Sequence, residues 1–504
     1  MKRYNGQYSK KLVEFKEKIK RIEYLKYTVN SLIYWDKITN MPVDSIGYRS
    51  QVMGFLAEEL YKSLSDVKLQ KYLDFFHGNE ENDDVVNGMI VRLKRNNSYV
   101  GKIPQKKYGE YISLVANAEQ VWEKAKKESD FQLFNPYLEQ IVEYFKEFAE
   151  YWGYEKHPYD ACVGYYEEGV TVENLDKMVK ELRNFIVENL KIIQEKQAKC
   201  NERPLSHSYR VPMAVEEQEK LSKWILETIG FSFSSGRLDA GAHPTTLANS
   251  PKDVRIVTSY DESDIRTGIF NTLHEGGKGL YEQDIDENLM GTLLAEVASF
   301  GIEEAVGRFY ENIIGRNKEF IKQLCDKIYE LCPNTKIDYQ AFYNSVNYVE
   351  PSFIRINADE VTYMLHIIIR YELEKELITG KIAVNDLPKE WKRKYKEYLG
   401  IEPKNHSDGV LQDIHWAAGY FGFFPSYILA NLLSAQLAGN IENELKPIDE
   451  LIASGDFEQI HQWLKHHLHK FGATYTSSEM IGKIAENGLS AEDYIKYIKC
   501  KYID

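Results

Sequence analysis

The sequence contains few cysteines and no long apolar run. Its 504 residues include five cysteines, an odd number scattered along the chain with no pair at zinc-ribbon spacing. This argues against a disulfide framework and against a thiolate metal site. No segment approaches the roughly 20 apolar residues of a membrane-spanning helix, and the first residues lack the apolar stretch of a signal peptide. We therefore expect a cytoplasmic protein with no membrane partner.

Positive charge is also scarce. The chain has 63 lysines and arginines against 77 aspartates and glutamates, which gives a net charge of −14. This balance disfavours binding to nucleic acid and to anionic membrane surfaces. It leaves room for a peptide or other small substrate, because a local basic pocket can lie inside an acidic protein. With 43% hydrophobic and 28% charged residues, the composition is that of a folded protein.

Proline is rare, with 14 residues in the chain, and the hydrophobic pattern predicts long helices. Apolar side chains in residues 9–33 recur at spacings of three and four, which is the pattern of one buried helix face. Strand-like alternation is clearest at 208–213 and 254–260. Further helices are predicted near residues 50–76, 106–128, 135–151, 173–198, 215–229, 303–330, 358–379 and 424–445. The sequence has no repeat and no flexible linker, so we expect one domain over residues 1–504.

The segment 262–283 carries the strongest chemical signal, His274-Glu275-Gly276-Gly277-Lys278. On a helix, positions 274 and 278 lie one turn apart on the same face. In the HExxH zinc motif this spacing brings two imidazoles to one metal, and the glutamate acts as general base. Only His274 and Glu275 fit that motif here. Taken alone, such a pair is more often a buried histidine beside a solvated glutamate, by roughly ten to one.

Glycines at 276, 277 and 279 are unusual in the middle of a predicted helix. Each costs about 1 kcal/mol relative to alanine. This indicates either that another part of the chain closely approaches the helix backbone or that the local geometry needs the space. A third metal ligand in zinc peptidases usually comes from a downstream helix, and Glu304 in the apolar segment 293–310 is the candidate.

Ordered motifs along the whole chain resemble the Taq-type thermostable metallocarboxypeptidases, metallopeptidase family 32. The match to GxxQDxHW is complete, whereas the others are close. The motifs are WDKITNMP at 35–42, RLDAGAHP at 237–244, DVRI at 253–256, LHEGGKGLYEQ at 273–283, GIEEAVGRFYEN at 301–312, IRINAD at 354–359, GVLQDIHW at 409–416 and GFFPSY at 422–427.

This resemblance implies a mostly α-helical, saddle-like domain with a deep groove and a short β-sheet at the active site. The helices of residues 1–150 are expected to form one wall or lid of that groove. The resemblance also implies a homodimer. The implied activity is a zinc-dependent hydrolase reaction that releases single residues from peptide C-termini.

The resemblance also assigns roles to individual residues. His274 and Glu304 are the implied zinc ligands, and Glu275 is the implied base that activates water. Arg355 suits the free carboxylate of a substrate, because a guanidinium matches a carboxylate with two donors. The remaining implied site residues are Arg255 and Gln412 for substrate binding, His415 and Tyr427 for hydrogen bonds to the scissile carbonyl, and Asp413 and Trp416 as support.

Four departures from the family pattern fall at the site. Lys278 occupies the position of the second zinc ligand, Thr245 and Val257 replace the family's phenylalanine and threonine, and Glu303-Glu304-Ala305 stands where the family has His-Glu-Ser. A catalytic zinc needs three protein ligands, and a protonated lysine repels it. Glu303 points about 100° away from Glu304 on a helix, and the reach of His243 is open, so substitute ligands are not evident.

Two outcomes are open for Lys278. A substitute ligand could restore the metal site, or the ammonium could occupy the cation position and pair with Glu304 and Glu275. The protein is then either a working metallocarboxypeptidase or a catalytically inactive homologue that binds peptide ends or acts as a scaffold.

A separate histidine group is interpreted as the solvated face of a helix; it comprises His461, His466, His467 and His469.

Overall fold

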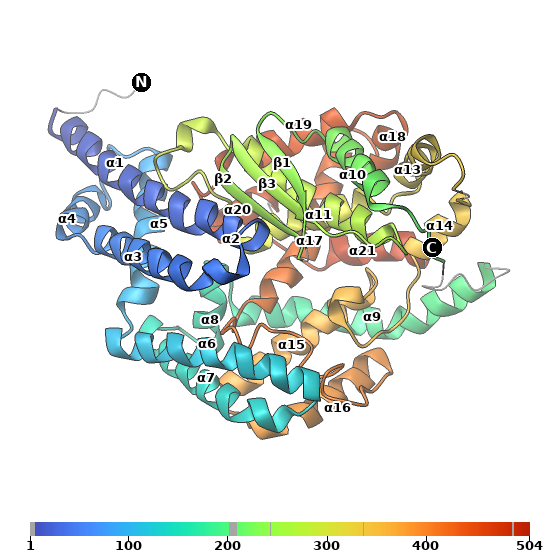
Figure 1. The fold of residues 1–504 in the computed structure, drawn as a ribbon, viewed down its shortest axis with the longest axis horizontal. Coiled ribbons are helices and arrows are strands. Elements are labelled where there is room, and N and C mark those ends of the chain that lie inside the picture. Colours follow the sequence, from blue (N-terminus) through green and yellow to red (C-terminus); the bar gives the residue numbers. More distant parts are fainter. Residues whose placement is uncertain (1–5, 201–208, 242, 336, 486–487) are drawn as a thin grey trace.

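The computed structural model describes residues 6–200, 209–241, 243–335, 337–485 and 488–504. Most of these residues are helical, and a three-stranded sheet lies near the middle of the molecule (Figure 1). The predicted mostly helical fold with a short sheet is confirmed. None of the helices in the described ranges is long and apolar enough to cross a membrane.

The first of two hydrophobic cores surrounds the sheet, and we call it the sheet core. It combines helices from the start, the middle and the end of the chain. Its helices are α1 (Gly6–Lys26), α3 (Ile46–Leu64), α4 (Val67–Phe76), α5 (Asp84–Gly101), α10 (Val215–Ile229), α11 (Arg266–Asp284), α12 (Phe300–Arg308), α13 (Lys318–Leu331), α14 (Tyr339–Val346), α18 (Ile448–Ala453), α19 (Phe457–His467) and α20 (Ser477–Ile484).

The second core is formed by helices and the segments that connect them, and we call it the helical core. In Figure 1 most of it lies below the sheet. Its helices are α6 (Gln105–Glu128), α7 (Phe131–Trp152), α8 (Pro158–Tyr166), α9 (Val172–Cys200), α15 (Thr362–Ile378), α16 (Leu387–Leu399) and α21 (Glu492–Tyr502). Shorter elements are α2 (Tyr34–Thr39), the π-helical segments Tyr27–Ile33 and Phe309–Ile314, and the 3-10 turns Val43–Ser45, Glu287–Leu289, Arg355–Asn357, Val384–Asp386 and His469–Phe471.

Helix α17 (Phe424–Glu444) belongs to both cores. It is apolar on nearly all sides, which is the pattern of a helix buried throughout. One set of its side chains packs in the sheet core, namely Ala430, Leu433, Leu437, Ala438 and Ile441. Another set packs in the helical core, namely Phe424, Ile428, Leu429, Leu432 and Ala435. The two cores are therefore connected through one shared helix.

The sheet consists of β1 (Gly236–Ala240), β2 (Thr245–Ser250) and β3 (Asp253–Thr258), with β3 in the centre. β3 pairs parallel with β1 and antiparallel with β2. The predicted strand at 254–260 corresponds to β3. The other prediction was wrong over the described residues 209–213, which are not a strand, and residue 208 lies outside the described ranges.

The predicted helices are present, but two of them are interrupted. The pattern at 50–76 covers α3 and α4, which separate where the Asp66 side chain accepts a hydrogen bond from the first turn of α4. The pattern at 303–330 covers α12 and α13, which separate at Gly315, where a Cβ would lie 2.5 Å from Leu273. The helices of residues 1–150 are divided between the two cores, and their role as a wall or lid stays a prediction.

Candidate functional site

Helix α11 lies tightly between α10, α12 and the sheet. A Cβ on Gly276 would lie 2.5 Å from Leu226 of α10, and a Cβ on Gly277 would lie 2.8 Å from the backbone oxygen of Val306 in α12. A Cβ on Gly279 would lie within 3.0 Å of side chains on β3 and the segment before β1. Real Cβ contacts are longer than this, so the glycines permit the packing. The predicted close approach to the helix backbone is confirmed.

Five side chains meet between α11 and α12, and we call them the α11 cluster: His274, Glu275, Lys278, Glu303 and Glu304. The Lys278 ammonium lies 3.3 Å from Glu304 Oε1, 3.5 Å from Glu275 Oε2 and 3.9 Å from Glu303 Oε1. Lys278 is buried, with 8% of its surface exposed. A buried lysine keeps its charge only when acidic partners compensate for its desolvation, and these carboxylates supply that compensation.

His274 is held between two glutamates. Its Nδ1 lies 3.0 Å from Glu311 Oε2, and its Nε2 lies 3.4 Å from Glu304 Oε1. Gly307 makes room for the ring, because a Cβ there would lie 2.9 Å from the imidazole. Burial alone would lower the pKa of His274, but the charges of Glu304 and the hydrogen bonds to both glutamates outweigh it and raise the pKa to about 9. Sequence reasoning missed Glu311, although it lies within the motif at 301–312.

Glu275 is positioned by the sheet. The hydroxyl of Thr246 on β2 lies 2.7 Å from Glu275 Oε2 and 2.9 Å from the Glu275 backbone oxygen. Sequence reasoning missed Thr246 because β2 was not predicted. The one available signal was its place directly after Thr245, one of the four departures from the family pattern.

The carboxylates of the α11 cluster differ in their acidity. Burial raises the pKa of Glu303 to about 7, with Lys278 acting in the opposite direction. Burial would also raise the pKa of Glu304, but His274 and Lys278 hold it well below its usual range. The pKa of Lys278 lies well above its ordinary value, because Glu275, Glu303 and Glu304 overcome the effect of its burial. Glu303 thus reaches the cluster, and the expectation that it points away was wrong.

The residues at this site do not fit a catalytic divalent metal. A metal bound to Glu304 Oε1 lies about 2 Å from that oxygen. Because the Lys278 ammonium is 3.3 Å from the same oxygen, the metal and the ammonium are then at most about 5 Å apart. Their repulsion is at least roughly 3 kcal/mol per unit of metal charge at an effective dielectric of 20. No group of three or more histidine, cysteine, aspartate or glutamate side chains in the described ranges is arranged to hold a metal ion.

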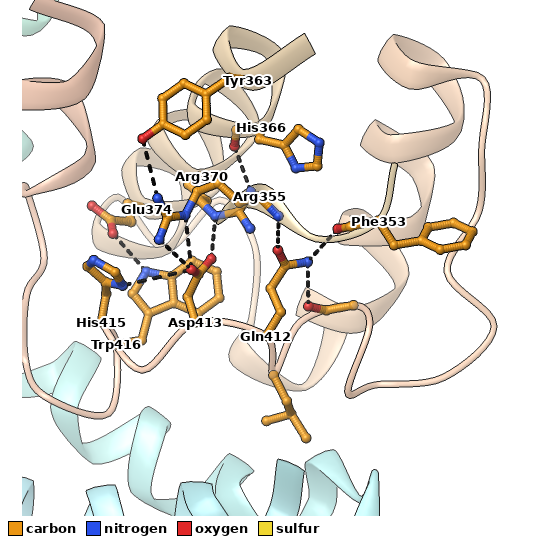
Figure 2. A network of polar contacts seen from close by, with 12 residues as sticks. Phe353, Arg355, Tyr363, His366, Arg370, Glu374, Gln412, Asp413, His415 and Trp416 are labelled. Carbon is orange, nitrogen blue, oxygen red and sulfur yellow. Dashed lines mark hydrogen bonds and ion pairs between the residues drawn. The ribbon is translucent and has the colours of Figure 1, made fainter. Parts of the chain in front are cut away.

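A second polar cluster lies where the 354–359 and 409–416 motifs meet α15, and Figure 2 shows it from close by. Asp413 lies between two arginines: Arg355 Nη2 is 2.9 Å from Asp413 Oδ1, and Arg370 Nε is 2.6 Å from Asp413 Oδ2. We call Arg355, Arg370 and Asp413 the arginine cluster. Burial would raise the pKa of Asp413, but the two guanidinium groups hold it far below its usual range.

Gln412 and Trp416 make hydrogen bonds next to the arginine cluster, Gln412 with backbone and Trp416 with a buried glutamate. Gln412 Oε1 accepts a hydrogen bond from the Arg355 backbone at 2.9 Å, and its amide group donates to the Phe353 oxygen at 2.9 Å. Trp416 donates to buried Glu374 at 2.7 Å. These contacts fit the predicted supporting role of Trp416. The Gln412 side-chain amide is hydrogen-bonded to backbone groups. The predicted contact of Gln412 with substrate stays a proposal.

The two clusters are connected through Arg308 and Tyr363. The Arg308 guanidinium lies 4.3 Å from the centre of the Tyr363 ring and donates to Glu311 at 2.9 Å. Arg355 Nη1 donates to the Tyr363 hydroxyl at 3.3 Å. The chain of contacts therefore runs from His274 through Glu311 to Arg355. Sequence reasoning gave no role to Arg308, which lies within the motif at 301–312, or to Tyr363, which lies beyond the motif at 354–359.

His415 and Tyr427 lie close to the arginine cluster, with His415 Nδ1 4.0 Å from Asp413 Oδ1. The Tyr427 ring centre lies 5.5 Å from the Arg355 guanidinium carbon. His415 packs against Phe423 and Phe424, and its buried Nδ1 has no hydrogen-bond partner. Burial lowers the pKa of His415 to about 4, even though the charge of nearby Asp413 acts to raise it. His415 is therefore neutral near pH 7.

Other predicted residues lie apart from these clusters. Arg255 donates two hydrogen bonds to Asp253 and lies over the Trp35 ring. Its neighbour Ile256 faces α11, so strand alternation turns Arg255 to the opposite face of the sheet. His243 is exposed.

Part of the histidine group is buried, contrary to the sequence interpretation. His461 and His469 each lie 2.8 Å from Asp284 Oδ2 at the end of α11. Asp284 is itself buried, and its charge compensates for the burial of the two rings. The pair therefore attaches α19 and the turn after it to α11.

Comparisons with known proteins agree with this architecture. Residues 14–502 match the family described as Carboxypeptidase Taq (M32) metallopeptidase. The chain is 40% identical over 494 residues to Carboxypeptidase 1 of Bacillus subtilis, which covers 97% of each chain. It is 36% identical over 475 residues to Thermostable carboxypeptidase 1 of Pyrococcus furiosus, covering 94% of this chain and 95% of that one.

A solved structure of Pyrococcus furiosus carboxypeptidase, described as Apo-Mg, matches with a TM-score of 0.93 and 34% identity, covering 98% and 99% of the two chains. Trypanosoma cruzi metallocarboxypeptidase 1 matches with a TM-score of 0.94 and 29% identity, covering 98% and 100%.

Proposed function

The chain belongs to the carboxypeptidase Taq (M32) metallopeptidase family, and from that premise we propose that it binds peptide C-termini at the arginine cluster without zinc-dependent hydrolysis. The observation that carries the binding proposal is a charge imbalance. Two buried guanidinium groups share the single carboxylate of Asp413. Within these three residues one positive charge is in excess; His415 adds none near pH 7, and buried Glu374, whose pKa is raised to about 7, is only partly ionised there.

A substrate carboxylate is suited to complete this cluster. Three of the five N–H donors of Arg355 face partners. Nε donates to Asp413 and Nη1 to the Tyr363 hydroxyl, while Nη2 forms an ion pair with Asp413 at 2.9 Å. Two donors remain beside the aromatic walls of Phe424 and Tyr427. A guanidinium binds carboxylates with two donors at once. A peptide carboxylate at Arg355 would accept hydrogen bonds from these two donors, and its negative charge would balance the excess positive charge.

The proposal of lost hydrolysis rests on Lys278. Zinc-activated water requires a metal, and the ammonium lies against Glu304 and Glu275, the implied ligand and the implied base. We therefore infer that this chain does not carry out the zinc-dependent hydrolysis of the family's active members. The family resemblance also implies a homodimer, and we propose that the homodimer is the form that binds peptide ends.

A second candidate function is metal-dependent carboxypeptidase activity. One observation favours it: Glu275 keeps an oriented carboxylate through its hydrogen bond with Thr246 at 2.7 Å, as a general base requires. His274, Glu304, His415 and Tyr427 are also retained. This function requires the ammonium to leave the α11 cluster when a metal binds.

Binding is tested with a fluorescent peptide that has a free C-terminal carboxylate and with the same peptide ended by an amide. We expect the amide to bind at least about tenfold more weakly, because a charge-assisted hydrogen-bonded pair contributes ~1.5–3 kcal/mol. Arg355→Gln should remove the preference for the free acid. Arg393→Gln, on the exposed surface of α16, serves as the matched arginine control and should leave the preference unchanged. Arg255→Gln is a separate variant that tests the predicted role of Arg255 in substrate binding. Equal affinity for both peptides in the natural protein would refute carboxylate recognition.

Hydrolysis is tested separately by amino-acid analysis of the same peptide after incubation with added zinc or with a chelator. We expect no released residue under either condition. Chelator-sensitive release that disappears in Glu275→Gln would establish the second candidate. The peptide-binding result would stand in either case, because it does not depend on turnover.

A further inference from the structure

We propose that Lys278 is a built-in cation that replaces the metal ion of this site, and that Glu303 is the counter-charge acquired with it. The position of the ammonium carries the first half of the proposal. Carboxylates from two helices converge on one point, with Glu275 from α11 and Glu303 and Glu304 from α12 all within 4 Å of Lys278 Nζ. Convergence of several carboxylates is the arrangement that a divalent cation otherwise stabilises.

The imidazole beside the ammonium supports the same reading. In a metal site, a carboxylate orients the ligand histidine through its other ring nitrogen, and Glu311 lies 3.0 Å from His274 Nδ1 in that position. Here His274 Nε2 is 3.4 Å from Glu304 Oε1 instead. The framework of a metal site is therefore retained around a cation that belongs to the chain.

In its ionised form, Glu303 balances the charge of Lys278. Two histidines of the family pattern are changed in this sequence, one to Lys278 and the other to Glu303. The first change adds a positive charge and the second adds a negative one, and the two side chains lie 3.9 Å apart across α11 and α12. Loss of function by random decay does not predict that opposite charges appear face to face. The pair is the arrangement expected of a site that was stabilised without metal.

The first measurement uses the natural protein. Zinc per chain is determined by mass spectrometry after purification and dialysis, and the thermal midpoint is measured with zinc and with a chelator. We expect less than about 0.1 zinc per chain, against the one ion of a structural or catalytic site, and no shift of the midpoint. Close to one zinc per chain, lost in His274→Ala, would overturn the proposal even if no other variant folds.

The second measurement uses Lys278→Met, which keeps the apolar stem and removes the charge. The uncompensated carboxylates should lower the thermal midpoint in chelator. Zinc should then bind at about one ion per chain and raise the midpoint, because His274 and the glutamates are left as ligands. Stability that is lost but does not respond to any zinc concentration would contradict the replacement of a metal by Lys278.

Lys394→Met is the matched control. Lys394 is also buried and lies 2.8 Å from Glu372 and 3.6 Å from Glu376, but its partners come from the helical core. Its loss should lower the midpoint without making it respond to zinc. An equal response in both variants would show that exposed carboxylates bind zinc unspecifically, and would overturn the proposal.

The two charges are tested together in a cycle of Lys278→Met, Glu303→Gln and the double variant, all in chelator. The double variant should lose less of the thermal midpoint than the sum of the single losses, because each side chain compensates for the other. Strict additivity would refute the paired exchange. These experiments involve no peptide, so their outcome is independent of the proposed binding at the arginine cluster.

Discussion

At the scale of single residues, the two clusters show how burial and charge set protonation in different ways. Lys278 and His274 lie among carboxylates, and their pKa values rise above the ordinary range. His415 lies beside the arginine cluster, and burial lowers its pKa to about 4. Neutral His415 therefore retains a lone pair and an N–H near pH 7, which suits a hydrogen bond to a bound peptide.

The depressed pKa of His415 predicts a pH dependence of stability. The unfolded state takes up a proton near pH 6.5 and the folded state only near pH 4, so the folded protein binds fewer protons between these values. The free energy of unfolding therefore rises with pH through this window, and the contribution is lost as pH falls, by about 3 kcal/mol in full. In His415→Phe, urea unfolding at pH 4.5 and pH 7 should show a smaller loss on acidification than the natural protein.

Glu374 provides a control of opposite sign. Burial raises its pKa to about 7, against hydrogen bonds from Tyr159, Trp416 and the Gly422 backbone. The folded state then binds more protons than the unfolded state between pH 4.5 and 7, so its contribution to stability is lost as pH rises. Glu374→Gln should therefore change the pH slope in the opposite direction to His415→Phe. Slopes that change in the same direction would contradict the assignment of both groups.

The residues of the site were predictable from sequence where they belong to ordered motifs. The motifs singled out Arg355, Asp413, His274 and Glu304, and the structure brings His274 close to Glu304 and Arg355 close to Asp413. Thr246 was not predictable, because it contributes through a half-buried strand with no alternating pattern. Thr246 acts through its contact with Glu275, which lies 29 residues away along the chain. The spacing of residues in the sequence does not reveal such a contact.

At the scale of elements, α11 depends on glycines that most helices would exclude. Its backbone lies against α10, α12 and the sheet at once, which brings the α11 cluster within reach of Glu303 and Glu304. The sequence indicated the close approach through the cost of three glycines. It could not identify which elements approach, because these lie far away along the chain.

Substitution of these glycines tests the packing of α11. Gly277→Ala should destabilise the protein by about 1–3 kcal/mol, because the new methyl group meets Tyr310 at 2.7 Å and the backbone oxygen of Val306 at 2.8 Å. Gly439→Ala is the matched control in the interior of α17, where a Cβ meets nothing within 4 Å. It should stabilise the protein by about 0.5–1 kcal/mol. Urea unfolding of both variants measures the difference, and equal effects would refute the close packing.

At the scale of the whole molecule, the two cores hold the two clusters of the site in fixed relation. The α11 cluster lies in the sheet core, and the arginine cluster lies at the helical core, where Arg370 is fully buried on α15. Helix α17 packs in both cores and carries Tyr427 beside Arg355. The long apolar pattern at 424–445 predicted a buried helix, but not that it would be shared.

This shared helix predicts that the two cores unfold together. Leu432 and Leu433 are adjacent and fully buried, yet Leu432 packs in the helical core and Leu433 in the sheet core. Each change to alanine should cost about 2–5 kcal/mol. If the cores are coupled through α17, hydrogen exchange should accelerate in both α10 and α16 in either variant, by about 30-fold or more for a loss of 2 kcal/mol. Acceleration of α16 alone in Leu432→Ala, and of α10 alone in Leu433→Ala, would show instead that the cores open independently and that the two clusters can move apart.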